Sequence, residues 1–274
     1  MPTRQRLSKQ ARRERIVAEL RANPTVRISA LAKAFGVTTE TVRRDVDSLS
    51  REGVVSRTYG GASVASLASE PSLDERYKTL TEERMRIASA AVRHVLPGDV
   101  LMIDSGATTG HFVRRLAATA MSEITVITNS IGHAAVLGAN AWVRVILCPG
   151  SYVARERAVY GPEVAQYLRR YRANTAFIGA GGLTEEGPND VSSELCWVKR
   201  AMIERAQSCT LLVDHTKLGN LGLELVCPLS EIARVVLDRA PDPEHQGIFA
   251  GGGPELVIAD AEANGLTTIA VEAT

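Results

Sequence analysis

Long apolar segments are absent from this chain of 274 residues, and cysteine is scarce. No run of about 18 apolar residues occurs anywhere, which excludes a membrane-spanning helix of ordinary length. The N-terminus is rich in arginine and lacks the apolar stretch that a secretory signal requires. We therefore expect a soluble, cytoplasmic protein that has no membrane partner.

Cysteine and histidine show no pattern that is typical of a metal site. The four cysteines, at positions 148, 196, 209 and 227, form no Cys-x-x-Cys pair and have no histidine at ligand spacing beside them. Four reduced and mostly buried thiols are the better interpretation. The histidines at 94, 111, 133, 215 and 245 form no helical i, i+4 pair and receive no role. We expect neither a metal nor a cofactor.

A net charge of only +1 conceals a strong asymmetry between the two ends of the chain. Residues 1–60 hold 13 Lys and Arg against 6 Asp and Glu, whereas residues 61–274 hold 19 against 25. Such a basic module is typical of proteins that displace counterions from nucleic-acid phosphates, although a solvated basic face is the alternative. The basic residues that cluster before or within the first predicted helix are Arg4, Arg6, Lys9, Arg12, Arg13 and Arg15.

Residues 38–51 read as a short helix with two different faces. An apolar stripe at i, i+4 and i+7 predicts the face that packs in a core, and it consists of Val42, Val46 and Leu49. The opposite face is free to contact a partner and carries Glu40, Arg44, Asp47 and Arg51.

A helix-turn-helix is completed by the residues before this helix. A shorter amphipathic segment with Ile28, Leu31, Ala32 and Phe35 ends at Gly36, and Thr38 is a suitable N-cap for the next helix. A glycine turn between helices is common outside DNA-binding proteins, so the basic charge is what sharpens the interpretation. Residues 53–61 then predict a β-hairpin wing, on which Arg57 and Tyr59 are placed to reach the DNA backbone or minor groove.

The remaining chain is long enough for a second domain with its own core. We predict a winged helix-turn-helix over 8–62, a linker over 63–80 and an α/β domain over 81–274. Predicted strands lie at 100–103, 124–128, 144–148, 175–179, 210–213, 234–237 and 267–271. Predicted helices lie at 82–94, 109–119, 131–137, 162–171, 193–207 and 254–263. This alternation favours a mostly parallel, Rossmann-like sheet covered on both faces.

Four loops that follow predicted strands are candidates for a binding site, because ligands of such sheets bind beyond the carboxyl ends of the strands. The loop 104–110 is hydroxyl-rich and opens a helix, so it can hold an anion, or it is only a tight turn. Loop 128–130 is polar but is equally a helix cap, and the glycines of 179–182 permit close approach of a ligand or merely a turn. In 214–217, Lys217 supplies a positive charge that Asp214 can direct, or the two form an ordinary surface pair.

Several of these residues resemble the DeoR family of bacterial transcription regulators. The resemblance to the N-terminal domain rests on Arg12, Ile16, Leu20, Thr38, the run 41–46 and the Gly-Gly-Ala sequence at 60–62. Matches at 71–76, 104–106, 126–130, 161, 198–203 and 214–217 resemble the family's C-terminal sensor domain, which is similar in fold to ribose-5-phosphate isomerase. Two departures, at 149–150 and 183–188, suggest an unusual ligand.

The resemblance implies a regulator, a repressor of a sugar-catabolic operon that a phosphorylated sugar releases from double-stranded operator DNA. The DNA-binding residues are then Thr38, Thr39, Glu40, Thr41, Arg43, Arg44, Ser48 and Arg57. The resemblance also implies a phosphate cradle, with supporting polar contacts and a lysine facing the sugar, made by Asp104, Ser105, Gly106, Ala107, Thr108, Thr109, Asn129 and Lys217. We expect a homodimer or homotetramer.

An isomerase with an appended basic domain is the alternative function. Aldose–ketose isomerisation needs a carboxylate base. The glycine loop 179–182 has none, and Glu194 at a helix start is well explained by the helix dipole. We therefore favour a binding pocket without turnover and assign no catalytic residue.

Overall fold

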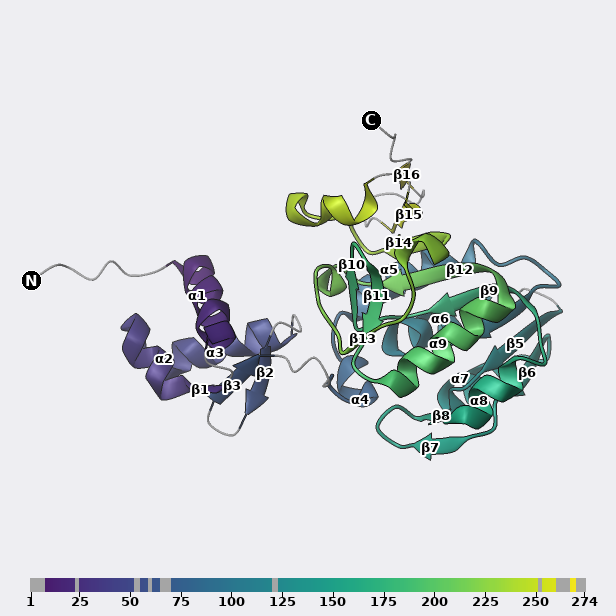
Figure 1. The fold of residues 1–274 in the computed structure, drawn as a ribbon, viewed down its shortest axis with the longest axis horizontal. Coiled ribbons are helices and arrows are strands. Elements are labelled where there is room, and N and C mark those ends of the chain that lie inside the picture. Colours follow the sequence, from purple (N-terminus) through teal and green to yellow (C-terminus); the bar gives the residue numbers. More distant parts are fainter. Residues whose placement is uncertain are drawn as a thin grey trace, which may run out of the picture. The chain divides into compact units, whose positions relative to one another are not determined.

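A computed structural model of the chain describes residues 8–22, 25–51, 55–58, 61–64, 70–119, 123–250, 253–259 and 267–269. The chain divides into two compact units, residues 1–70 and 71–274 (Figure 1). No helix of the described residues is long and apolar enough to cross a membrane.

The first unit is a winged helix-turn-helix. Its elements are α1 (Lys9–Ala22), β1 (Thr25–Arg27), α2 (Ile28–Phe35), α3 (Thr39–Arg51), β2 (Val55–Thr58) and β3 (Gly61–Val64). Gly36 ends α2 in the left-handed conformation, at φ 64°. The stripe of α3 is buried as predicted, in a core of Ile16, Leu20, Ile28, Leu31, Ala32, Val42, Val46, Leu49 and Val55.

The predicted wing is confirmed as an antiparallel pair of β2 and β3. Its second strand, β3, begins at Gly61, where the predicted hairpin ended. The strand β1 was not predicted from the sequence and pairs with the other side of β3. Tyr59 lies outside the described residues.

A mostly parallel eight-stranded sheet forms the centre of the second unit, in the order β16-β15-β14-β12-β9-β4-β5-β6. The strands are β4 (Val100–Ile103), β5 (Ile124–Thr128), β6 (Val143–Leu147), β9 (Ala173–Ile178), β12 (Ala206–Val213), β14 (Arg234–Leu237), β15 (Glu255–Ile258) and β16 (Thr267–Ile269). Only the pairing of β15 with β16 is antiparallel. From β4 the chain adds β5 and β6 toward one edge of the sheet. It then returns to the other side of β4, where β9 is followed toward the opposite edge by β12, β14, β15 and β16. The switch point between β4 and β9 is where a ligand crevice is expected in such sheets.

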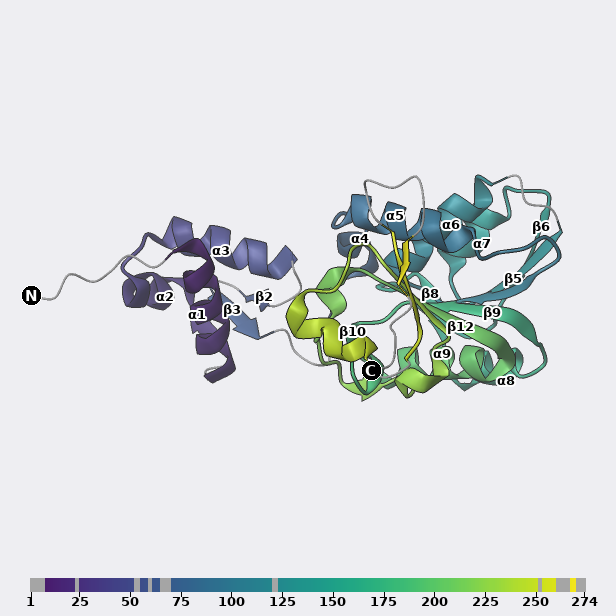
Figure 2. The ribbon, with the colours of Figure 1, turned by 90° about the horizontal axis from the view of Figure 1, so that it is seen from above.

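Helices cover both faces of this sheet, as Figure 2 shows. One face carries α5 (Thr81–Val92), α6 (Ala107–Ala117) and α7 (Ile131–Leu137), and the other carries α8 (Pro162–Leu168) and α9 (Ser193–Arg205). Successive strand residues alternate between the two cores: Leu101 and Ile103 pack on the α5 side, whereas Met102 packs on the α9 side.

Smaller elements surround the carboxyl edge of the sheet. They are α4 (Leu73–Arg76), the hairpin of β7 (Ser151–Val153) and β8 (Ala158–Tyr160), and a three-stranded sheet of β10 (Gly182–Thr184), β11 (Gly187–Asp190) and β13 (Glu224–Leu225). Short 3-10 helices η1 (His215–Lys217), η2 (Leu229–Glu231) and η3 (Pro243–Phe249) complete the described part of the unit.

One predicted element is wrong. The helix expected over 254–263 is contradicted by β15, whose Leu256 and Val257 pack on opposite faces of the sheet. A strand that is buried on both faces reads as a continuous apolar run, which periodicity alone cannot distinguish from a helix.

Candidate functional site

The exposed face of α3 carries most of the predicted DNA-contacting residues. Thr38, Thr39, Glu40, Arg43 and Arg44 are exposed, and Thr41 and Ser48 are half-buried. The hydroxyl of Thr38 accepts the Thr41 N–H at 3.2 Å, so it caps the helix. Arg57 lies on β2, and its side chain is outside the described part of the chain.

Glu40 contacts both arginines of this face. Its carboxylate lies 3.3 Å from Nε of Arg44 and 3.9 Å from Nη1 of Arg43. The Arg44 side chain is 80% exposed, so this ion pair adds little stability and leaves the guanidinium accessible.

Arg12 serves the core of the first unit instead of lying on its basic surface. Its Nε donates to Oδ2 of Asp45, and the Asp45 side chain is buried. The pair joins α1 to the recognition helix α3. Arg12 and Asp45, two residues of the N-terminal pattern, thus have a structural role.

In the second unit, a buried ionic cluster lies at the switch point of the sheet. Asp104 directly follows β4, and both of its carboxylate oxygens lie 3.2 Å from the backbone N–H of Gly179, after β9. The Lys199 ammonium, from α9, donates to Asp104 and lies 3.5 Å from Oδ2 of Asp190. All three charged side chains are buried. Burial by itself lowers the pKa of Lys199, but Asp104 and Asp190 outweigh it and raise that pKa, so the amine stays protonated.

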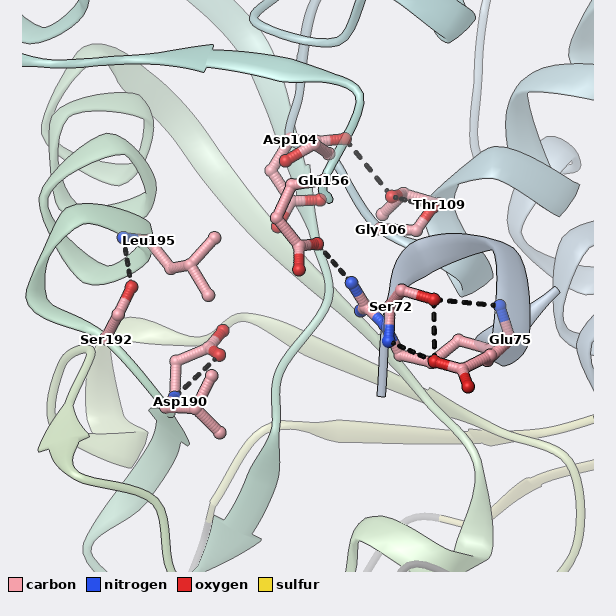
Figure 3. A network of polar contacts seen from close by, with 12 residues as sticks. Ser72, Glu75, Asp104, Gly106, Thr109, Glu156, Asp190, Ser192 and Leu195 are labelled. Carbon is pink, nitrogen blue, oxygen red and sulfur yellow. Dashed lines mark hydrogen bonds and ion pairs between the residues drawn. The ribbon is translucent and has the colours of Figure 1, made fainter. Parts of the chain in front are cut away.

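The start of α6 lies beside this cluster and has no side-chain cap. Gly106 is the N-cap, and the first turn contains no acidic residue. The Thr109 hydroxyl donates back to the Asp104 carbonyl at 3.1 Å, which fixes the loop (Figure 3). By contrast, Ser130 caps α7 and Ser192 caps α9. At the positive end of α6, therefore, the structure shows no side-chain cap and no acidic residue that would compete with an anion.

Contacts with β8 close the site on another side. The hydroxyls of Ser105 and Tyr160 lie 2.6 Å apart, and both residues are buried. Asn129 donates from Nδ2 to the Val159 carbonyl at 3.1 Å, while its buried Oδ1 has no hydrogen-bond partner within the described part of the chain. The hairpin of β7 and β8 is thus fixed against the loops that follow β4 and β5.

Lys217 is half-buried on η1, beyond the end of β12. Asp214, which the sequence analysis places to direct Lys217, also has partners of its own. Asp214 accepts from Arg84 at 3.2 Å and 3.3 Å and from the backbone N–H of Thr216 at 3.2 Å. His215 instead contacts Asp238, with Nδ1 at 2.8 Å from Oδ2, and this hydrogen bond raises the pKa of His215.

Four residues of this region received no site role from the sequence: Arg84, Tyr160, Asp190 and Lys199. Only Lys199 left a readable signal, because it falls on the apolar stripe of α9, three residues after Cys196 and three before Met202. No group of three His, Cys, Asp or Glu side chains among the described residues is arranged to hold a metal ion.

Comparison with known families identifies both units. The model of the DeoR C terminal sensor domain matches residues 79–239, and that of the DeoR-like helix-turn-helix domain matches residues 12–67. The chain belongs to the DeoR family. This DeoR-family protein is therefore a DNA-binding transcriptional regulator rather than an enzyme.

Relatives match along nearly the whole chain. The HTH-type transcriptional repressor GlcR of Bacillus subtilis is 30% identical over 91% of this chain and 97% of its own length. The Glycerol-3-phosphate regulon repressor of Escherichia coli is 27% identical over 85% of this chain and 92% of its own.

Among solved structures, ribose 5-phosphate isomerase A of Methanocaldococcus jannaschii is similar with a TM-score of 0.38 and 17% identity, over 50% of this chain and 54% of that chain. The probable sor operon regulator of Shigella flexneri has a TM-score of 0.35 and 10% identity, over 54% of this chain and 81% of that chain.

Proposed function

We propose that this DeoR-family regulator represses a sugar-catabolic operon and that a phosphorylated sugar, bound in residues 71–274, releases it from operator DNA. The observation that carries the proposal is the polar site at the switch point of the sheet. There an uncapped helix start lies beside a buried cluster of two carboxylates and one ammonium. The names of the relatives support repression, and one of them is named for a glycerol-3-phosphate regulon.

The two halves of the site suit the two halves of a sugar phosphate. Backbone N–H groups at the start of α6 suit a phosphate, held by Ser105, Gly106, Ala107, Thr108 and Thr109. The carboxylates of Asp104 and Asp190 are hydrogen-bond acceptors, so they suit the hydroxyl groups of the sugar. Lys217 faces the sugar from η1 in this proposal, and Asn129 completes its polar contacts.

Operator DNA is proposed to contact the exposed face of α3 and the wing. Arg43 and Arg44 are the residues we assign to the major groove, with Thr38, Thr39, Glu40, Thr41 and Ser48 around them and Arg57 on the wing. The domain limits 8–62, 63–80 and 81–274 and a homodimeric or homotetrameric state also remain proposals. The second unit begins at 71, and α4, which lies within the proposed linker, packs on this unit.

The function is tested by operator binding in the presence of candidate effectors. An operator is selected from random duplexes, and its affinity for the full chain is measured by fluorescence anisotropy during titration with phosphorylated sugars. We expect one of them to weaken DNA binding by about 5-fold to 150-fold, the usual range of allosteric coupling.

A negative charge introduced at the cradle provides the decisive variant. Thr108→Asp places a carboxylate at the proposed phosphate position, so we expect loss of the effector response with operator binding intact. Thr119→Asp makes the same chemical change beyond the opposite end of α6 and should respond like the wild type. If the Thr108→Asp protein still releases DNA at the same sugar-phosphate concentration, the phosphate binds elsewhere.

A further inference from the structure

The helix α7 buries a histidine at a position where an apolar side chain is expected. His133 and Leu137 are four residues apart, so they lie on one face of the helix. Leu137 shares a core with Phe112, Val113 and Leu116 of α6. His133 lies one turn closer to the carboxyl edge of the sheet, and only 2% of its surface is exposed.

Neither ring nitrogen of His133 has a hydrogen-bond partner among the described residues. Its backbone N–H is satisfied by the hydroxyl of Ser130, so only the ring is without partners. Oδ1 of Asn129, four residues earlier at the end of β5, is also buried without a partner. Three unpaired polar atoms in one corner are unusual in a folded protein, because each loses its bonds to water without replacement.

The corner formed by the end of β5 and the first turn of α7 adjoins the uncapped start of α6. Burial, followed by the charge of Arg114, lowers the pKa of His133 to about 4, so the ring is neutral at neutral pH. The backbone of Gly106, the N-cap of α6, opposes that shift as a weak acceptor for the ring, although neither ring nitrogen reaches full hydrogen-bonding geometry. A neutral imidazole has one N–H donor and one acceptor. The ring therefore adds a donor beside the N–H groups of α6.

We propose that His133 is a further effector-binding residue, which donates one ring N–H to the phosphate held at the start of α6. The proposal rests on the function proposed above. The acceptor Oδ1 of Asn129 then takes an O–H from the sugar, so one ligand satisfies atoms that otherwise have no partner. A phosphate monoester of a polyol carries both the acceptors and the donors that this corner needs.

The test measures binding of inorganic phosphate to the full chain by calorimetry. His133→Leu removes both ring nitrogens and places an apolar side chain like that of Leu137 on the same face. We expect phosphate affinity to fall about tenfold or more, as for loss of a hydrogen bond to a charged group. The thermal midpoint without phosphate should stay or rise, because unpaired buried polar atoms are removed. The matched control is His111→Leu, which removes a ring on α6 that faces Tyr77, and it should change the affinity less than about twofold.

Two comparisons separate failure of this inference from failure of the proposed function. Normal phosphate affinity in His133→Leu, with loss of binding in Thr108→Asp, overturns the role of His133 alone. Normal affinity in both variants overturns the phosphate cradle as well. If His133→Leu does not fold, nitrogen NMR of histidine-labelled wild-type protein decides. We expect the His133 ring resonances to shift on saturation with phosphate, and unchanged resonances would contradict the proposal.

Discussion

Arg44 is the side chain of α3 whose loss should be most informative about DNA recognition. It is largely exposed, and its ion pair with Glu40 is weak enough to exchange for contacts with a base. If Arg44 reads a guanine edge, Arg44→Ala should cost about 1–3 kcal/mol of operator binding, concentrated at one base pair.

The measurement is anisotropy titration against a panel of single-base operator variants. Lys33→Ala, an exposed residue near the end of α2, is the control for loss of one positive charge. A uniform weakening across the panel would instead make Arg44 a phosphate contact, with a reduced salt dependence.

The ion pairs of buried carboxylates could not be predicted from the sequence. Asp45, Asp104 and Asp214 are each paired with a cation: Arg12, Lys199 and Arg84, respectively. The partners are 33, 95 and 130 residues away along the chain. An aspartate after a strand reads as a solvated loop residue, and only the fold brings the distant cation to it. The sequence therefore predicted that Asp104 follows a buried strand but not its buried pair.

At the scale of elements, buried apolar segments were predictable and short segments of mixed polarity were not. Residue ranges for β4, β5, β14 and α7 agree with the predicted ones because their apolar residues give an unambiguous pattern. The hairpin β7–β8 and the sheet of β10, β11 and β13 were missed, since β7 and β8 have only three residues each and β10, β11 and β13 consist largely of glycine, proline and polar residues. These short elements supply Tyr160 and Asp190, so part of the site was missed with them.

The helix α4 shows how the segment after residue 70 is attached to the sensor domain. Ser72 and Glu75 form a capping box, and Arg76 pairs with Glu156 in the turn between β7 and β8 (Figure 3). Just after α4, the Tyr77 ring contacts the guanidinium of Arg114 at 4.5 Å from its centroid. The helix α6, at whose start we propose that the phosphate binds, thus contacts the segment that follows residue 70.

Gly110 permits this contact, because a Cβ at that position would lie 2.0 Å from the Tyr77 hydroxyl oxygen. Gly110→Ala should therefore lower the free energy of unfolding of the second unit by about 1–3 kcal/mol, as overpacking does. In a Tyr77→Ala background the same change should stabilise by up to about 1 kcal/mol, because alanine favours a helix more than glycine does. Denaturant unfolding of the four proteins measures the cycle. The same sign in both backgrounds would show that Tyr77 is not the constraint.

The charge asymmetry of the whole chain bears on how copies of the protein assemble on DNA. The basic residues belong to a small unit with a single recognition helix, which reads only a short half-site. The second unit holds 204 of the residues, from 71 to 274, and is the candidate to join copies. We therefore expect useful specificity to require two recognition helices bound at once, since linked contacts multiply affinity.

Helical phasing of the operator tests this assembly. Two half-sites bound by one symmetric dimer must lie on the same face of the duplex, about 34–36 Å or a multiple apart. Inserting five base pairs between them rotates one half-site by about half a turn, so we expect affinity to fall at least about a hundredfold. An insertion of ten base pairs restores the common face and should recover more affinity than the shorter insertion does. Gel-shift titrations of the three operators provide the affinities, and sedimentation of the free protein provides its mass. Equal affinities for all three, with a monomeric mass, would contradict the dimer and leave one recognition helix to bind its half-site alone.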